Sequence, residues 1–170
     1  MSVMQELDQW HELIKPVNVD LVALYKKLTL DELEELQHAV EVPEIVKEAC
    51  DVIVTARGML LAQVHPDWVH LHFIESMRAL ILGFCGDWEH PLHLVNQSNF
   101  SKLILKHEVD EAMNHFDTAG IDVYVSSLGS GYFGAYSRHD QTVKGKAYPT
   151  DKLLKSHKYA PIDESKEWWL

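Results

Sequence analysis

Four acidic side chains recur at one spacing on two neighbouring stretches of the chain. Glu32 and Glu35 are three residues apart, as are Glu48 and Asp51, and twelve residues separate the two pairs. Side chains three residues apart share one face of a helix. Carboxylates gathered near a core repel one another and lose hydration, so they need cations between them. Because all four donors are oxygens, the pattern predicts a site for Mg²⁺ or Mn²⁺ completed by waters and substrate phosphates.

Helical periodicity separates these acids from their neighbours. Glu32 lies four residues from both Leu28 and Leu36, on the apolar side of its predicted helix. The same spacing places Glu35 on this side, whereas Glu34 belongs to an outward polar row. A single pair of this kind is common on amphipathic helices. A second pair on the next helix, across a short turn, favours a metal site over four solvated acids.

The elements that must position these acids are helices. Periodic apolar residues predict helices over residues 2–15, 18–41, 44–64, 67–84, 91–106 and 107–120, the last ending at Gly120. The short link "EVP" implies that the second and third helices are antiparallel. "IDVYVSSLGSGYFGAYS" predicts a β-hairpin, and from Gln141 onward the chain is polar, basic and turn-rich. The expected fold is one mainly helical domain with a small β-hairpin and a basic C-terminal extension.

Composition limits the partners and the compartment. The formal net charge of −11 argues against general binding to nucleic acid or to an anionic membrane. Six cations stand against two acids between Arg138 and Lys158, and a basic segment on an acidic body suits a metal–polyanion ligand. No apolar run is long enough to span a membrane, and the N-terminus is unlike a signal peptide. Cys50 and Cys85 are expected to be buried thiols in a reducing, cytoplasmic compartment.

The acidic spacing and its surroundings resemble a known superfamily. "LDELEELQHAV" and "KEACDVIV" are similar to the two metal-binding helices of the all-α nucleoside triphosphate pyrophosphohydrolases, which include the MazG-like enzymes. "VNQSNFSKL" resembles the "HRSNMSKL" stretch of that superfamily. "KLLKSHKYAPID" resembles the tail of a phage and bacterial subgroup described as phosphoribosyl-ATP pyrophosphohydrolase-like. The resemblance covers residues 3–105 and 152–163.

The resemblance implies a fold, a reaction and a cofactor. Residues 1–106 would be a MazG-like helical catalytic core, and residues 107–170 would add a helix, a hairpin and a basic tail to the same domain. The bundle would be completed as a homodimer or homotetramer in a bacterial or phage-infected cytoplasm, where it would control the nucleotide pool. It would hydrolyse a nucleoside triphosphate to monophosphate and pyrophosphate with Mg²⁺. Glu32, Glu35, Glu48 and Asp51 would hold the metal, and one of them would orient or deprotonate the attacking water.

The two later motifs supply candidate substrate contacts. Asn99 and Lys102 are expected on one helical face and match the superfamily's substrate-contacting Asn and Lys. Lysine suits phosphate as a mobile point charge. Lys155 and Tyr159 are the candidates in the basic tail, which would either close over the phosphates or act as an arm between subunits.

Two other functions compete with this one. The dipeptide His139-Asp140 is found in metal phosphohydrolases of the HD type, but His139 follows a predicted strand whereas such a site needs histidines on helices. A non-catalytic helical oligomerisation or nucleotide-sensing module with the same fold is the other alternative. The presence of all four acids counts against it. Mg²⁺-dependent release of pyrophosphate separates the three hypotheses.

Overall fold

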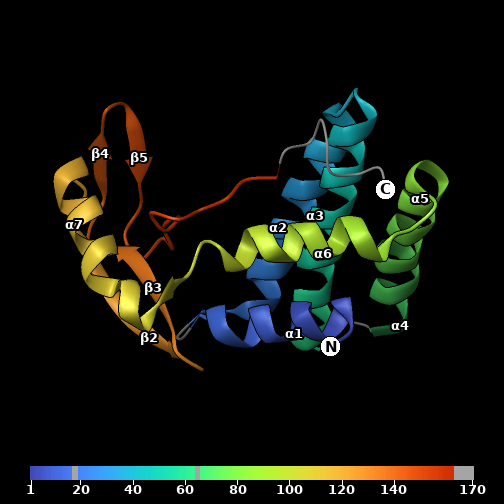
Figure 1. Ribbon diagram of the computed structural model, residues 1–170. Helices are drawn as coiled ribbons and strands as arrows, with labels where there is room; N and C mark the ends of the chain where they lie inside the picture. Colours follow the sequence, from blue (N-terminus) through green and yellow to red (C-terminus); the bar gives the residue numbers. More distant parts are fainter. Residues whose placement is uncertain (17–18, 64–65, 163–170) are drawn as a thin grey trace. The chain divides into compact units, whose positions relative to one another are not determined.

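The computed structural model describes residues 1–16, 19–63 and 66–162. The chain is mainly helical and has a small antiparallel sheet toward its C-terminus, as the sequence predicts (Figure 1). Residues 1–96 and Ile162 belong to one compact unit, and residues 97–161 form the other. None of the helices in the described ranges has the length and hydrophobicity that crossing a bilayer requires.

The first unit is built on an antiparallel helix pair, as predicted from the short link between the two helices. Asp20 begins α2 by accepting a hydrogen bond from the backbone N–H of Ala23 at 3.1 Å. Pro43 lies in the first turn of α3, where it costs no helical hydrogen bond. Asn18, expected to begin the second helix, lies outside the described residues. The helices of this part are α1 (Val3–Ile14), α2 (Leu21–His38) and α3 (Val42–Leu61).

A chain of buried hydrogen bonds ties these three helices together. Burial lowers the pKa of His11, which keeps its imidazole neutral with one donor and one acceptor nitrogen. The Tyr25 hydroxyl donates to Nδ1 at 2.9 Å, and Nε2 donates to the carbonyl oxygen of Val54 at 2.8 Å. Gly58 makes room for the tyrosine, because a Cβ there would lie 2.2 Å from a carbon of the Tyr25 ring. The relative positions of α2 and α3 are therefore fixed by specific contacts.

The next helical stretch agrees with the prediction in extent but not in its inner geometry. α4 (Pro66–Val69), a π-helical turn (His70–Glu75) and α5 (Ser76–Cys85) follow one another without a break. Gly86 ends α5 in the left-handed conformation. Cys50 is buried as expected and Cys85 is half-buried, and both are free thiols.

The prediction that the fifth helix reaches residue 106 is wrong. α6 (Glu89–Phe100) ends six residues earlier, because backbone bonds from Lys102 to Asn99 and from Leu103 to Phe100 tighten the last turn. The following residues then pair with a strand. The chain passes from the first unit to the second within α6.

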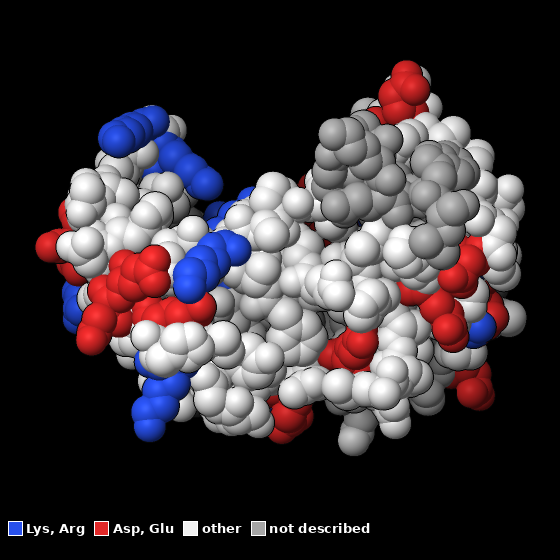
Figure 2. Space-filling view, in the orientation of Figure 1, with Lys and Arg blue, Asp and Glu red and all other residues white. Residues whose placement is uncertain are grey.

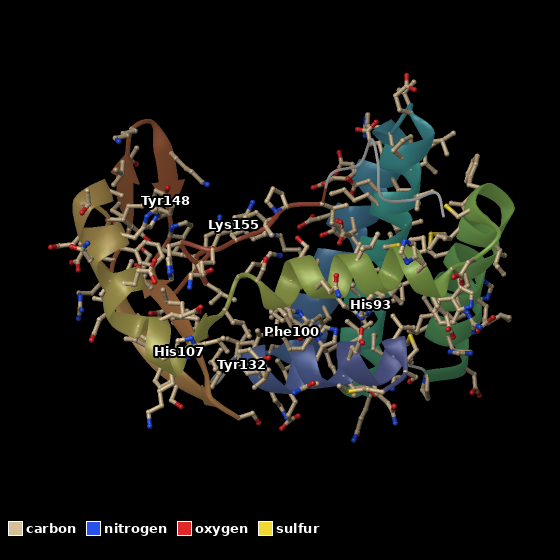
Figure 3. The ribbon with its side chains drawn as sticks, in the orientation of Figure 1. His93, Phe100, His107, Tyr132, Tyr148 and Lys155 are labelled. Atoms are coloured by element: carbon tan, nitrogen blue, oxygen red, sulfur yellow. The ribbon has the colours of Figure 1, made fainter. Side chains whose placement is uncertain are left out.

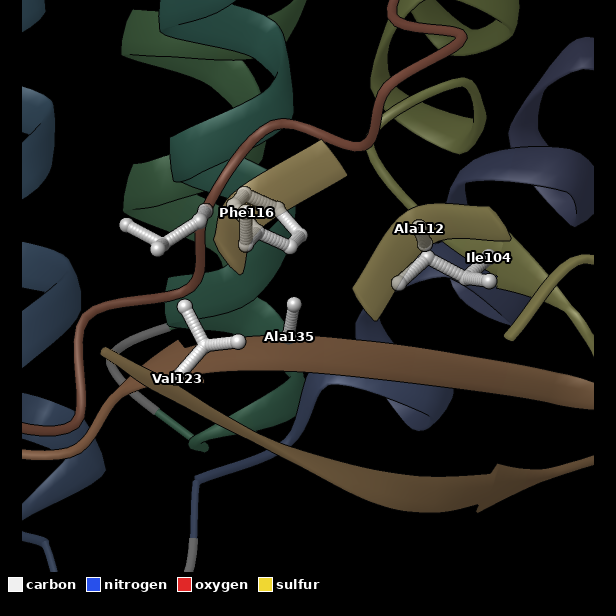
Figure 4. Packing of buried hydrophobic residues seen from close by; sticks show 6 residues of the cluster. Ile104, Ala112, Phe116, Val123 and Ala135 are labelled. Atoms are coloured by element: carbon white, nitrogen blue, oxygen red, sulfur yellow. The ribbon is translucent and has the colours of Figure 1, made fainter. Parts of the chain in front are cut away.

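The second unit packs one helix on a three-stranded antiparallel sheet. The predicted hairpin is β2 (Val123–Gly129) with β3 (Tyr132–Ser137), and β1 (Ile104–Leu105) pairs with the other edge of β3. The predicted helix is α7 (Val109–Ala119), ended by Gly120 in the left-handed conformation. Figure 4 shows the core between them, which consists of Ile104, Ala112, Phe116, Val123, Ala135 and Leu154.

The basic C-terminal segment is part of this folded unit. A second hairpin, β4 (Gln141–Val143) with β5 (Lys146–Tyr148), forms where the sequence indicated only turns. Lys144 and Gly145 at its tip both have positive φ, as such a tight turn requires. Beyond it, the backbone N–H of Leu154 donates to the carbonyl oxygen of Ala135 at 2.8 Å, and the leucine side chain enters the core.

Candidate metal centre

The antiparallel helix pair brings three of the four predicted acids together. Glu32 comes from α2, and Glu48 and Asp51 come from successive turns of α3. One carboxylate oxygen from each lies within 4.8 Å of the others. Glu48 is buried, and the other two are half-buried. Three oxygens at this spacing are a donor set for a hard divalent cation.

The fourth predicted acid stands apart from this group. Glu35 is exposed, so the prediction that it faces inward like Glu32 is wrong. It still lies close enough for its charge to raise the pKa of Glu32. The exposed position of Glu34 agrees with its predicted place on the outward row. Glu35 therefore lies at the edge of the acidic group, and Glu34 does not belong to it.

The buried carboxylate of Glu48 has an oxygen in need of a partner. Its Oε1 accepts a hydrogen bond from Lys47 Nζ at 2.5 Å. Its Oε2 is buried and, within the described ranges, has no hydrogen-bond partner. A buried carboxylate oxygen without a donor costs free energy unless a cation binds it. The residues present fit a divalent cation for two reasons: a buried carboxylate oxygen needs a partner, and all the donors are oxygens.

Sequence reasoning missed Lys47. Its Nζ lies 2.5 Å from Glu48 Oε1 and 3.2 Å from Asp51 Oδ2, and its side chain is 30% exposed. Burial opposes the lysine charge, but the carboxylates of Asp51 and Glu48 outweigh burial and raise its pKa. The signal was present in the sequence, since Lys47 precedes Asp51 by four residues. This ammonium already balances part of the negative charge and would compete with a metal.

The repulsion between the carboxylates has its clearest effect on the pKa of Glu32. Burial, together with the charges of Asp51, Glu35 and Glu48, raises its pKa from 4.5 to about 7, and Lys47 only partly offsets the rise. Below that pH Glu32 holds a proton that a bound cation would displace. Metal binding at this site is therefore linked to pH.

The predicted substrate contacts meet in the second unit, near the end of α6. Asn99 is buried, and its Oδ1 accepts a hydrogen bond from Lys102 Nζ at 2.6 Å. Lys102 follows the helix instead of lying on it, but the tight last turn keeps the two side chains together. Asn99 thus fixes one end of the Lys102 side chain.

The C-terminal tail binds to this same turn. The Ser156 hydroxyl donates to the carbonyl oxygen of Ser101 at 2.7 Å, and the Ser156 N–H donates to that of Lys102 at 3.1 Å. The Ala160 N–H then donates to the Ser101 hydroxyl at 3.0 Å. These serines, which sequence reasoning did not single out, hold the two later motifs side by side.

Lys155 and Tyr159 complete the group. Figure 3 shows Lys155 on the tail segment, and its Nζ lies 4.2 Å from the centre of the Tyr159 ring. Burial alone would raise the pKa of the Tyr159 phenol. The hydrogen bond with the Ser98 side chain and the charges of Lys155 and Lys102 outweigh burial and lower that pKa. The positive charges of Lys155 and Lys102 therefore both favour ionisation of the Tyr159 phenol.

The His139-Asp140 dipeptide has another role. Asp140 accepts two hydrogen bonds from Thr150, one from its backbone N–H at 2.7 Å and one from its hydroxyl at 2.9 Å. His139 is exposed, with Nδ1 3.4 Å from Asp122 Oδ2. Both residues follow β3, and in the described part of the chain neither belongs to a metal-ligand cluster. The contacts of Asp140 with Thr150 and of His139 with Asp122 hold the loop between β3 and β4 in place.

No protein-family model, no curated protein and no solved structure matches this chain. The resemblance of its motifs to the pyrophosphohydrolases therefore stays a prediction. Glu32, Glu48 and Asp51 form a candidate cation site because their carboxylate oxygens lie within 4.8 Å of one another.

The raised pKa of Glu32 predicts how stability depends on pH. Between pH 4.5 and 7 the unfolded chain releases a proton that folded Glu32 retains, so its contribution to the free energy of unfolding falls as pH rises through this window. In chelator, the melting temperature of the wild type should fall relative to that of Glu32→Gln as pH rises from about 4.5 to about 7. Mg²⁺ at a hundredfold excess over its dissociation constant should add about 2.7 kcal/mol to the wild type.

Glu34→Gln is the matched control for this measurement. Glu34 is exposed on the same helix, so its substitution should leave both the pH profile and the Mg²⁺ response of the wild type unchanged. Identical pH profiles for the wild type and Glu32→Gln, or a melting temperature indifferent to Mg²⁺, would contradict the site.

Removing Lys47 tests whether its ammonium competes with a metal. Lys47→Gln should lower stability in chelator, because Glu48 and Asp51 lose their counter-charge. The same change should tighten Mg²⁺ binding by about tenfold, or about 1.4 kcal/mol, as measured by isothermal titration calorimetry. Lys27→Gln, which removes an exposed lysine 3.9 Å from Asp31, serves as the control and should change neither quantity.

The opposite result has a clear meaning. If Lys47→Gln is destabilised and Mg²⁺ neither binds nor restores its stability, Lys47 is the permanent counter-ion of a structural acidic cluster. The metal site would then be rejected.

Proposed function

We propose that this protein is a Mg²⁺-dependent nucleoside triphosphate pyrophosphohydrolase with a MazG-like helical fold completed by homo-oligomerisation. The observation that carries the proposal is the convergence of Glu32, Glu48 and Asp51 across the α2–α3 pair, with a buried and unpartnered Glu48 oxygen among the described residues. Oxygen donors at a helix seam suit a hard cation that binds nucleotide phosphates.

The acids of the first unit have distinct parts in this proposal. Glu32, Glu48 and Asp51 would hold Mg²⁺ or Mn²⁺, which when bound supplies an activated water and neutralises phosphate charge. Glu35 keeps its carboxylate in water, and this suits it to accept the proton of the attacking water. Because Glu32 is protonated below about pH 7, activity should decline toward acidic pH.

The second unit contains lysines that suit binding of a phosphate. The charges of Lys155 and Lys102 both favour ionisation of the Tyr159 phenol, and Lys155 Nζ lies 4.2 Å from the centre of the Tyr159 ring. Asn99 orients the Lys102 ammonium through a 2.6 Å hydrogen bond. Lysines held in this way favour binding of a phosphate and of the charge that develops on departing pyrophosphate.

One observation favours the non-catalytic alternative. Lys47 already neutralises Glu48 and Asp51 without a metal, which a purely structural helix pair would also need. Two facts favour catalysis. Lys47 leaves Glu48 Oε2 unpartnered among the described residues, and it does not keep the pKa of Glu32 near its ordinary value.

The proposed reaction has a defined outcome. Attack by water at the α-phosphorus should give nucleoside monophosphate and pyrophosphate, and ¹⁸O from labelled water should appear in the monophosphate. Glu48→Gln should lower kcat by at least about a hundredfold through loss of a metal ligand, whereas Glu34→Gln should retain wild-type activity. Label in the pyrophosphate would mean attack at the β-phosphorus, and orthophosphate as primary product would exclude this reaction class.

Point substitutions test the lysine group better than truncation, because the tail contributes Leu154 to the core of the second unit. Lys102→Ala and Lys155→Ala should each raise KM about tenfold through loss of a charged contact with phosphate. Lys158→Ala is the control from the same tail, since its Nζ is occupied by Glu108 Oε1 at 2.7 Å. An unchanged KM in both test variants, or an equal rise in the control, would remove these lysines from the substrate site.

A further inference from the structure

We infer that the second unit contains a separate binding site for a transition metal of the zinc type, formed by Glu111 and His115 of α7 and His157 of the tail. Glu111 and His115 are four residues apart, so they project from the same face of α7. His157 lies against this face, and all three line one pocket of about 560 Å³. The rest of its lining includes Asn114, Thr118 and Lys144, the last from the tip of the β4–β5 hairpin drawn beside α7 in Figure 1.

His157 is the observation that points to a ligand. Its side chain is only 7% exposed. Both of its ring nitrogens are buried and have no hydrogen-bond partner among residues 1–16, 19–63 and 66–162. A neutral imidazole always presents one lone pair, and burying it unpaired is costly. A metal ion bound to that lone pair would remove the cost.

The spacing to Glu111 matches two ligands of one metal. His157 Nε2 lies 3.4 Å from Glu111 Oε2 without forming a hydrogen bond. Two ligand atoms bound at about 2.1 Å to a tetrahedral zinc are themselves about 3.4 Å apart. Glu111 Oε2 also lies 3.7 Å from Lys158 Nζ. The Glu111 side chain is exposed, so it can turn toward either Lys158 or His157.

His115 would supply the third donor after a change of rotamer, because among the described residues only Glu32, Glu48 and Asp51 already place three ligand atoms within 4.8 Å of one another. Its ring centre is 6.3 Å from that of His157, and its side chain is exposed and free to change rotamer. Rings of two histidines on one tetrahedral metal are about 5 Å apart by the same bond lengths. Two imidazoles and a carboxylate select zinc, cobalt or nickel over magnesium, in contrast to the all-oxygen group of the first unit.

The two proposed metal sites can be told apart by cobalt. With Mg²⁺ saturating the acidic group, one equivalent of Co²⁺ should give the strong visible absorption of four-coordinate nitrogen-bound cobalt, which oxygen-only octahedral cobalt lacks. Zn²⁺ should displace it stoichiometrically and raise the melting temperature, because the metal would join the tail to α7. Glu32→Gln should leave this signal unchanged, so failure of the proposed function would not affect it.

Variants make the assignment specific. His115→Ala and Glu111→Gln alter exposed side chains, so they should stay folded by circular dichroism while Co²⁺ affinity falls at least about tenfold. His157→Ala should abolish the signal, and His107→Ala, at another exposed histidine of this unit, should not change it. Absence of a one-to-one complex in the wild type would overturn the inference, and so would undiminished binding by His115→Ala and Glu111→Gln.

Discussion

Repulsion between carboxylates at the α2–α3 seam is the constraint on which the first unit depends. Three acids place oxygens within 4.8 Å of one another, and burial leaves little water to screen them. Two features reduce this repulsion: Lys47 binds Glu48 and Asp51, and Glu32 retains a proton to about pH 7. Neither feature removes the repulsion completely. A divalent cation would replace both by satisfying Glu48 Oε2 and ionised Glu32 together.

The surrounding helices prevent the acids from moving apart. His11 joins α1 to α2 and α3 through buried hydrogen bonds, and Gly58 allows Tyr25 to approach α3 closely. Asp8 and Arg57 add a two-point ion pair between α1 and α3, with contacts of 2.6 and 2.9 Å. Side chains held in place in this way would lose little entropy if a metal bound them.

Local sequence patterns predict those features of the fold that depend on interactions between residues a few positions apart. The structure confirms that Glu48 and Asp51 share one face of α3, that a short link joins α2 to α3 and that Gly120 ends α7, and each of these features depends on residues a few positions apart. The prediction for Glu35 is wrong because this residue lies at the edge of the helix face, where periodicity cannot distinguish an exposed side chain from one that faces α3. The binding of Ser156 to Ser101 joins residues 55 positions apart, and no local pattern reports such a contact. The same holds for the approach of His157 to α7.

The acidic group lies in the first unit, and the lysine group with its serine-bound tail lies in the second. Anomalous diffraction from crystals grown with Mn²⁺ tests most directly whether the carboxylates of the first unit form a divalent-cation site. We expect a peak bound by Glu32, Glu48 and Asp51, with the Lys47 ammonium displaced from at least one carboxylate. Lys47 still bonded to both Glu48 and Asp51, with no peak at a saturating Mn²⁺ concentration, would contradict this expectation.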